Sequence, residues 1–246
     1  MVPVEILDYI FGLLDGDKSS LEACSKVNPS FAKIVERHLY AHLGIVSDFP
    51  LSFNDPHAFS CSQLSKLLSE NPQVVKYIRS LRLEMNRGSE GMMELTSILP
   101  MLSNLERIFL RSWSPVSWPI LDELFRKTFI DCLLHLKGLF LDSIGDFPLS
   151  ILDKCDNLKR LSLYNFYSDP VQQSLCCRLE YLSVKYCRNF LSRLSGLNLR
   201  NLRSFVFSPF ADRDFDQLQM LFQACSTSLT TLELFLGNFR RSFHHI

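Results

Sequence analysis

Hydrophobic residues at the start of the chain recur with the period of an α-helix. The stretch VPVEILDYIFGLLDGD, residues 2–17, places Pro3 in a first-turn position and Glu5 near the positive helix start, and Asp15-Gly16-Asp17 ends the pattern. The apolar positions cover an arc of roughly 160°, against roughly 100° for an ordinary surface helix. These positions are Ile6, Leu7, Ile10, Phe11, Leu13 and Leu14. The helix is therefore either buried on two sides by its own protein or has one side free for a partner.

Two more short helices are predicted in the next thirty or so residues. Ser19 to Glu22 has the spacing of a capping box, and Asn28-Pro29 resembles a cap followed by a first-turn proline. The second helix has apolar positions at Leu21, Cys24 and Val27. The third has an apolar stripe that runs to about Gly44, formed by Phe31, Ile34, Val35, His38 and Leu39. Three helices of this size make a small core, which favours a neighbouring domain or a partner.

A degenerate repeat fills the chain from residue 75 onward. Its apolar residues follow the spacing L-x-x-L-x-x-L-x-L, and the gaps between central positions run from 21 to 31 residues. That period overlaps the 20 to 29 residues typical of leucine-rich repeats. The central positions are Leu81, Ile108, Leu139, Leu161, Leu182, Phe205 and Leu232. Each unit predicts a short strand and a return segment, and β-branched and aromatic residues at strand positions weigh against an all-helical interpretation.

The segments between the predicted strands carry helix and turn signals. We expect helices near residues 62–72, 118–129, 168–175 and 212–225. Leucine-rich repeats often carry Asn or Cys three residues past the strand, where Asn86 and Cys187 lie in this sequence. Only GNFRRSFHHI follows the last predicted strand. Because solenoids need polar end caps, we expect that a partner covers the last repeat or that the chain is a shortened version of a longer one.

Composition narrows the classes of protein that this chain can be. Its 246 residues are 47% hydrophobic and 21% charged, as in ordinary globular proteins, and 26 basic residues balance 26 acidic ones. No global field therefore attracts a nucleic acid, and we expect none as a partner. No apolar run is long enough to cross a bilayer, and the start lacks the features of a signal peptide. We expect no membrane association and a location in the cytoplasm, the nucleus or both.

Cysteine, histidine and glycine patterns do not predict an enzyme. The eight cysteines lack paired spacing, and Cys24, Cys155, Cys176 and Cys225 fall on apolar positions, as free structural thiols do. Cys176-Cys177 are adjacent and His244-His245 have no matching thiol pair, so no metal site is expected. The common phosphate-loop, hydrolase and zinc-protease motifs are missing. We expect no cofactor, and a Cys–His pair that meets in space is the disfavoured alternative to buried thiols.

Residues 2–40 resemble an F-box, the adaptor-binding motif of SCF-type ubiquitin ligases. That pattern opens Leu-Pro-x-Glu followed by two hydrophobic residues, continues to a Val-Cys-x-x-Trp segment and closes on Leu-Trp or Leu-Phe. Val2, Asn28 and Phe31 depart from it, and Leu39-Tyr40 matches the close. The resemblance, with the over-wide apolar arc, implies a set of adaptor-binding residues. These are Pro3, Glu5, Ile6, Leu7, Ile10, Leu14, Val27 and Phe31. Among them, Val27 and Phe31 are expected to hold the helices at the right angle.

The whole chain resembles the F-box and leucine-rich-repeat substrate receptors of these ligases. The expected fold is α/β, with a three-helix F-box at 1–45, a linker and capping helix at 46–74, and about seven irregular repeats at 75–246 that form a curved parallel sheet with helices on its convex side. The resemblance implies a non-catalytic ligase subunit that binds a Skp-type adaptor, through it a cullin, and a protein substrate. The alternatives are a leucine-rich scaffold with no ubiquitin role, and helices that only cap the repeats.

The target is expected on the concave face of the strands. Strand side chains alternate, so the residues that flank the inward apolar positions point away from the core. In the central repeats they combine aromatic and Arg side chains, which are common at binding hot spots. These residues are Arg107, Phe109, Arg111, Phe140, Asp142, Arg160, Tyr164, Tyr181 and Lys185. The alternative is a solvated strand face whose aromatic residues pack on their neighbours.

Overall fold

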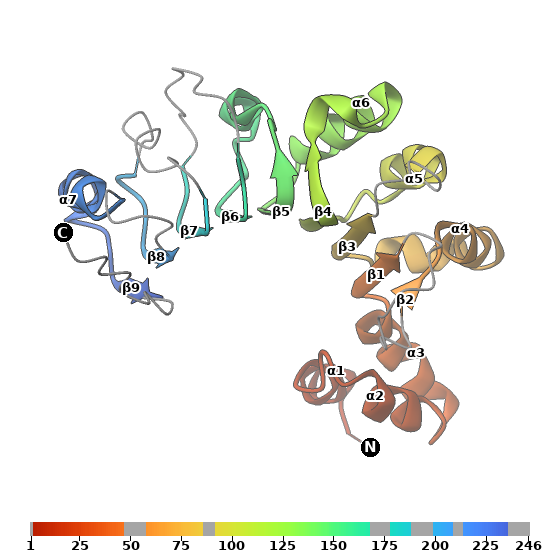
Figure 1. The fold of residues 1–246 in the computed structure, drawn as a ribbon. Helices are drawn as coiled ribbons and strands as arrows, with labels where there is room; N and C mark the ends of the chain where they lie inside the picture. The colour runs from red at the N-terminus through yellow and green to blue at the C-terminus, as the bar shows by residue number, and fades with distance from the viewer. Residues whose placement is uncertain are drawn as a thin grey trace, which may run out of the picture. The chain divides into compact units, whose positions relative to one another are not determined.

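The protein has an α/β fold in which strands alternate with helices and pair in parallel, as predicted (Figure 1). A computed structural model describes residues 2–46, 58–85, 92–167, 178–187, 199–208 and 214–235. The chain divides into two compact units. The first unit comprises Met1–Ser114 and Ile120–Cys132, and the second comprises Pro115–Pro119 and Leu133–Ile246.

Three short helices open the first unit, as the hydrophobic pattern predicted. They are α1 (Val4–Gly12), α2 (Lys18–Ser25) and α3 (Pro29–Leu39). Asn28 caps α3 as predicted, because its side-chain oxygen accepts a hydrogen bond from the Phe31 N–H at 2.9 Å. The capping box predicted at Ser19 to Glu22 is wrong. Asp17 caps α2 instead, since its carboxylate accepts from the Ser20 N–H at 3.1 Å and from both neighbouring serine hydroxyls.

A small apolar core holds these helices together. Phe11, Leu21, Ile34 and Val35 are buried in it, and the Phe11 and Phe31 rings meet edge to face with centroids 5.5 Å apart. Five more side chains pack against it while keeping some exposure. They are Leu7, Leu14, Cys24, Phe31 and Leu39. The core thus uses one side of α1, contributed by Leu7, Phe11 and Leu14.

Four parallel strands complete the first unit, in the order β2, β1, β3, β4. Their bounds are β1 (His42–Val46), β2 (Ala58–Phe59), β3 (Ser80–Met85) and β4 (Arg107–Ser117). The third helix was predicted to run to about Gly44, which is wrong, because α3 ends at Leu39 and β1 begins three residues later. Leu43 and Ile45 are buried while their neighbours are more exposed, which is the two-residue period of a strand.

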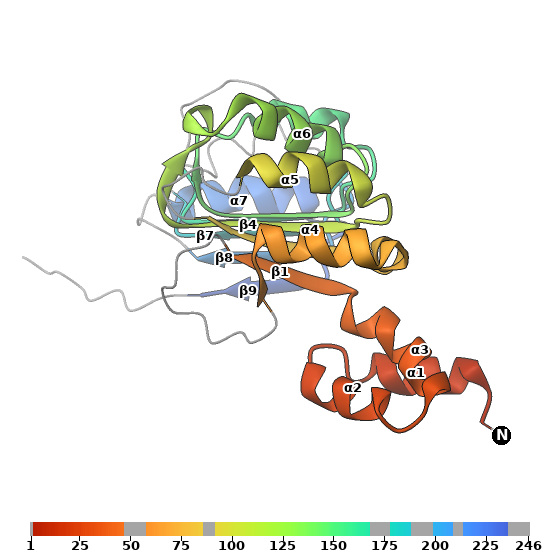
Figure 2. The ribbon, with the colours of Figure 1, turned by 90° about the vertical axis from the view of Figure 1, so that its right-hand side faces the viewer.

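The remaining helices of the first unit lie on one face of these strands (Figures 1 and 2). They are α4 (Cys61–Glu70), η1 (Pro72–Lys76), α5 (Met92–Ile98), η2 (Leu99–Met101) and α6 (Glu123–Leu133). The helix expected near 62–72 is α4, and Ser60 and Gln63 form a capping box at its start. The helix expected at 118–129 begins later than predicted, because Asp122 caps α6 by accepting from the Phe125 N–H at 2.9 Å.

Five parallel strands, in chain order, form the second unit. They are β5 (Gly138–Gly145), β6 (Arg160–Tyr164), β7 (Tyr181–Lys185), β8 (Ser204–Ser208) and β9 (Thr231–Leu234). The short helices η3 (Trp118–Ile120) and η4 (Leu149–Lys154) and the predicted helix α7 (Asp214–Cys225) accompany them. The helix expected at 168–175 lies outside the described residues. The predicted central positions are direct partners across the strands, from Leu139 through Leu161, Leu182 and Phe205 to Leu232, which confirms that these repeats are equivalent.

Equivalent positions of three successive repeats share one backbone conformation. Ser143 in β5 and Asn165 and Tyr186 just after β6 and β7 each lie four residues past a central leucine and have φ values of 59°, 47° and 56°. Asn165 suits this left-handed region and donates a side-chain hydrogen bond to the Ser143 hydroxyl at 3.1 Å. Cys187 follows Tyr186 in the same turn, with its thiol 3.2 Å from the Lys185 carbonyl, as its position predicted. Asn86, the other predicted turn residue, lies outside the described part of the chain.

Strand β9 is expected to be the least protected strand of the second unit. Leu232 and Leu234 are each 42% exposed, whereas Leu182 in β7 is fully buried. Few buried contacts lower the free energy of local opening. Hydrogen exchange followed by mass spectrometry should therefore be faster in β9 than in β7. Equal protection of the two strands would show that β9 is held by contacts that its exposure does not reveal.

Candidate functional site

Helix α1 exposes a continuous apolar stripe on the side that faces away from the core. At 100° per residue, Ile6, Tyr9, Ile10 and Leu13 fall within an arc of roughly 100°. We call these four residues the α1 stripe. Ile6 and Ile10 are 49% and 45% exposed, and Tyr9 and Leu13 are more exposed still. The excess apolar arc inferred from the sequence is thus a real surface, because the three-helix core covers only the opposite side of α1.

The predicted adaptor-binding residues divide between this surface and the core. Pro3, Glu5, Ile6 and Ile10 are exposed on α1 or at its start, whereas Leu7, Leu14 and Phe31 pack against the core. Val27 was predicted to hold the helices at their angle together with Phe31. This is wrong for Val27, which lies in the turn after α2 with 66% of its surface exposed. The prediction did not include Tyr9 and Leu13, which the structure places on the same exposed stripe, although their spacing from Ile6 and Ile10 was a usable signal.

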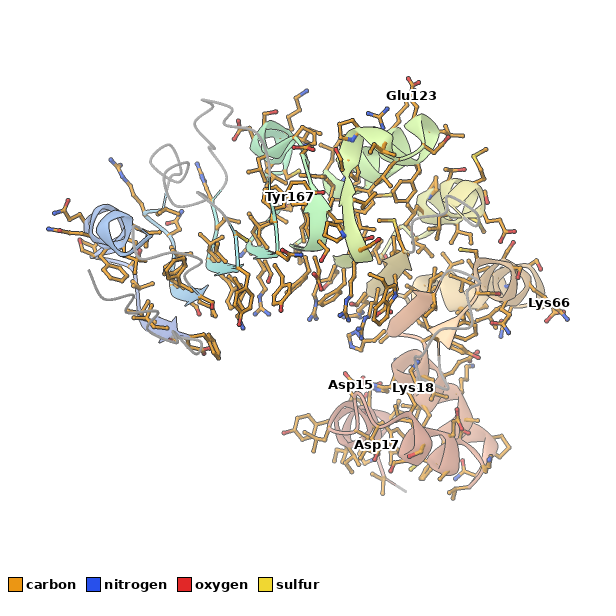
Figure 3. All side chains as sticks on the ribbon, in the orientation of Figure 1. Asp15, Asp17, Lys18, Lys66, Glu123 and Tyr167 are labelled. Atoms are coloured by element: carbon orange, nitrogen blue, oxygen red, sulfur yellow. The ribbon has the colours of Figure 1, made fainter. Side chains whose placement is uncertain are left out.

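A histidine fixes α1 against α3. The His38 Nε2 and Asp8 Oδ1 atoms are 3.1 Å apart, and the His38 Nδ1 and Asp15 Oδ1 atoms are also 3.1 Å apart. Asp15 is labelled in Figure 3, in the turn that follows α1. An imidazole can donate to two carboxylates when both ring nitrogens carry a proton. His38 thus joins α3 to both α1 and its turn, and it sets the direction in which the α1 stripe faces.

Replacing His38 by alanine is expected to lower the free energy of unfolding of the helical motif by about 1 to 2 kcal/mol. Two partly exposed carboxylates, those of Asp8 and Asp15, lose their contacts with one imidazole, and their exposure keeps the loss of stability below that of a buried ionic hydrogen bond. Urea unfolding followed by circular dichroism would measure it. Arg37→Ala is the control. The Arg37 side chain is about half exposed and its guanidinium lies 3.9 Å from the Asp8 carboxylate, so it makes only a weak contact with the same residue. Equal effects of the two substitutions would contradict the proposed role of His38.

The strands of the first unit carry three of the predicted target-binding residues on one face. Arg107, Phe109 and Arg111 alternate along β4, and all three are half-buried. Their partners on β3 are Ser80, Arg82 and Glu84, respectively. Directly paired residues of parallel strands point to the same face, so the six side chains form one surface. The prediction missed Arg82 and Glu84, although they occupy the same repeat positions as Phe109 and Arg111.

The other six predicted target-binding residues lie on the second unit. Arg160 pairs with Tyr181, and Asp142, Tyr164 and Lys185 form one row across three strands. Phe140 occupies the row between them. Tyr164 meets Tyr186 edge to face at 5.3 Å, and the Lys185 ammonium lies 4.1 Å from the ring centre of Phe235. The structure therefore divides the nine predicted residues into two groups, each on its own unit.

The described cysteines are structural. Cys155 and Cys225 are buried, Cys24 is half-buried, and Cys176 lies outside the described residues. Burial is the main cause that raises the pKa of the Cys132 and Cys155 thiols to about 11, with smaller contributions from Asp131 for Cys132 and from Asp156 and Asp153 for Cys155. Such thiols are protonated at neutral pH and are poor nucleophiles. This favours the predicted structural role over a catalytic one.

Alkylation should reflect these raised pKa values. At pH 8 only about one molecule in a thousand carries the Cys132 or Cys155 thiolate, which is the reactive form. We expect iodoacetamide to modify both residues far more slowly in the native protein than in urea, and the native rate should rise between pH 8 and pH 10. Peptide mass spectrometry would measure the rates. Fast native labelling of Cys155 at pH 7 would contradict the structural assignment.

A cavity of about 390 Å³ lies where the helical motif meets β2 and α4. It is lined by Lys18, Glu22, Leu39, Tyr40, Ala58, Phe59 and Gln63. These residues include no cysteine, histidine or serine. Within the described residues, no three His, Cys, Asp or Glu side chains are grouped to hold a metal ion. No helix of that part of the chain has the length and apolar character needed to cross a membrane.

Comparisons with known proteins give no match to this chain, either among protein families or among curated proteins. A function has to be inferred from its surfaces. Those surfaces are the α1 stripe, the β3–β4 face of the first unit and the strand face of the second unit. The α1 stripe is apolar with one tyrosine, and the two strand faces carry aromatic and Arg side chains, which are types enriched at protein-binding surfaces.

Proposed function

We propose that this protein is the substrate receptor of an SCF-type ubiquitin ligase. In this proposal, α1 to α3 are an F-box that docks a Skp-type adaptor, and the adaptor links the chain to a cullin. The strands belong to leucine-rich repeats that bind the protein to be ubiquitinated. The receptor itself performs no chemistry and works in the cytoplasm, the nucleus or both.

The α1 stripe is the observation that carries this proposal. Large aliphatic side chains rarely gather on a surface unless another molecule covers them. Here the motif core is already filled from the opposite side of α1, and Ile6 and Ile10 stay about half exposed among the described residues. A docking helix of this kind needs a partner with an apolar groove. The resemblance of residues 2–40 to an F-box makes a Skp-type adaptor the partner that we propose.

In this proposal, the predicted adaptor-binding residues contribute to docking in different ways. Ile6 and Ile10, with Tyr9 and Leu13, enter the adaptor groove, while Pro3 and Glu5 start the helix beside it. Leu7, Leu14 and Phe31 support the helix from behind, since they pack on the motif core. Val27 contributes only if the adaptor reaches the turn after α2, because that side chain is largely exposed.

The repeated strands support the second half of the proposal. Their in-register central leucines and shared turn conformation are what stacked leucine-rich repeats require. Stacking leaves one strand face for recognition, and in both units that face carries Arg and aromatic side chains. Proteins of this design recognise other proteins through such faces. The target of this chain is therefore expected on one or both strand faces.

Affinity purification from cells in which degradation is blocked tests the proposal. The tagged chain should bring down a Skp-type adaptor, a cullin and at least one further protein that accumulates in ubiquitinated form. An Ile6→Ala and Ile10→Ala variant should lose the adaptor and cullin but keep the further protein. If the parent chain recovers a partner without adaptor or cullin, the chain is a repeat scaffold with no ubiquitin role, and the proposal is wrong.

A further inference from the structure

The β3–β4 face of the first unit is locally basic, although the chain as a whole is neutral. Three guanidinium groups, those of Arg82, Arg107 and Arg111, share this face with one carboxylate, that of Glu84. The net charge of these four side chains is two positive charges, on a small area of two strands that lie roughly 4.8 Å apart. Such a local excess attracts an anionic group even when the net charge of the protein is zero.

Glu84 is the buried acidic residue of this surface, and it holds Arg82 in place. Its side chain is only 3% exposed and holds the Arg82 guanidinium at 2.7 Å through Oε1, while the Arg82 side chain remains 45% exposed. The other oxygen, Oε2, is buried and has no hydrogen-bond partner among the described residues. A buried carboxylate oxygen without a hydrogen-bond partner costs folding free energy, so its presence asks for an explanation. Here it holds Arg82 beside Phe109 with part of the guanidinium facing solvent.

The other end of the face is basic as well. Burial lowers the pKa of His42, the Asp15 carboxylate raises it, and the nearby Arg107, Lys18 and Arg79 side chains lower it. His42 and Ser80 share a row with Arg107. Arg107 and Arg111 are thus the two basic ends of this face, and Phe109 occupies the row between them.

We propose that this face binds an extended acidic segment of the target protein, with two acidic residues four positions apart and a large apolar residue midway between them. Alternate residues of an extended chain point the same way and are about 6.6 Å apart, both in β4 and in a bound peptide. The acidic side chains then pair with Arg107 at one end and with Arg111 and Arg82 at the other. The apolar residue contacts Phe109. This inference rests on the proposed function, since it describes the target of that receptor.

An acidic peptide suits the face better than a nucleic acid does. The face has a surplus of two positive charges, from three arginines and Glu84, which matches two separate carboxylates better than a continuous line of phosphates. Nucleic-acid sites also need basic residues over a wide surface, and the chain has no excess of them. A peptide presents its charges only at chosen positions, so it can match two basic ends with an apolar centre.

The test is fluorescence anisotropy of the full chain with a labelled synthetic peptide, GSDSLSDSG. We expect binding, at least about tenfold weaker binding when both aspartates are replaced by asparagine, and a similar loss when the spacing between them is shortened by one residue. Substituting Arg107→Glu and Arg111→Glu together should also weaken binding at least about tenfold. Arg107→Lys with Arg111→Lys should bind within about threefold of the parent, because charge is kept.

A charge-reversal variant away from the strand face serves as the matched control. Lys66→Glu with Lys127→Glu changes the net charge equally on α4 and α6, away from the strand face (Figure 3 labels Lys66), and it should bind the peptide like the parent. No dependence on the two arginines in folded variants, or equal binding of the asparagine peptide, would overturn the inference. Equally tight, arginine-dependent binding of a single-stranded oligonucleotide would also overturn it. Adaptor binding, measured in parallel, reports separately on the proposed function.

Discussion

Replacing Ile6 and Ile10 together by alanine is expected to weaken adaptor binding roughly 12- to 150-fold. Full burial of such a side chain contributes about 1.5 to 3 kcal/mol, and each of these is about half exposed before binding. Docking therefore gains about 1.5 to 3 kcal/mol from the pair, which corresponds to that factor in Kd. Titration of the purified variant with the adaptor would measure the change.

The matched control truncates two equally large aliphatic side chains elsewhere on the first unit. Ile120 and Leu124 are also exposed, but they lie before and at the start of α6, away from α1. Their double alanine variant should bind the adaptor like the parent. Circular dichroism should show both variants folded, since none of the four side chains belongs to the motif core. Equal affinity of both variants would exclude the α1 stripe as the adaptor-binding surface.

Phe11→Ala is expected to unfold the helical motif under conditions in which the second unit stays folded. Phe11 is 3% exposed and meets Phe31 edge to face, so its truncation leaves a cavity in a core of only a few residues. Removal of a buried phenylalanine side chain costs about 3 to 5 kcal/mol. A motif with so small a core has little stability to lose. Hydrogen exchange in residues 4–39 should accelerate strongly.

Phe11→Leu is the milder comparison, because most of the buried volume is kept. It should cost about 1 kcal/mol and leave the motif folded. Exchange in β6 and β7 should be the same in both variants, which separates a local effect from general unfolding. Unchanged protection of α1 to α3 in Phe11→Ala would mean that the motif core does not depend on this ring.

The sequence predicted those features that depend on local periodicity. The three helices followed from apolar residues at helical spacing and from the Asn28 cap, and the repeat pattern placed the central leucines in register. The excess apolar arc of α1 was also visible, because an angle around a helix follows directly from residue number. The α1 stripe was thus largely predictable from residue spacing alone.

The predictions that failed concern the ends of helices, where neighbouring residues carry competing signals. Ser19 and Asp17 both suit a helix cap, and only the structure shows that the Asp17 carboxylate is the group that accepts from Ser20. His42 to Val46 extends the apolar stripe of α3 by helical counting, yet Leu43 and Ile45 belong to a strand that pairs with β3. Val27 is apolar and well spaced, but α2 ends before it.

The target surface was the least predictable part. Alternation along a strand indicates which side chains leave the core, but it does not tell which strands form one compact unit. Arg107, Phe109 and Arg111 proved to share a face with Arg82 and Glu84, whose ion pair joins residues two apart on one strand. The alignment of Leu81 with Ile108 already places Arg82 opposite Phe109 and Glu84 opposite Arg111, but it does not indicate the ion pair or the burial of Glu84, which depend on side-chain packing.

Calorimetric titration of the purified chain with a purified Skp-type adaptor tests the central claim most directly. The proposed function predicts a single site with a Kd of about 10 µM or tighter, together with slower hydrogen exchange in α1 when the adaptor is bound. Absence of binding at an adaptor concentration of about 100 µM, by a chain whose three helices are folded, would contradict it.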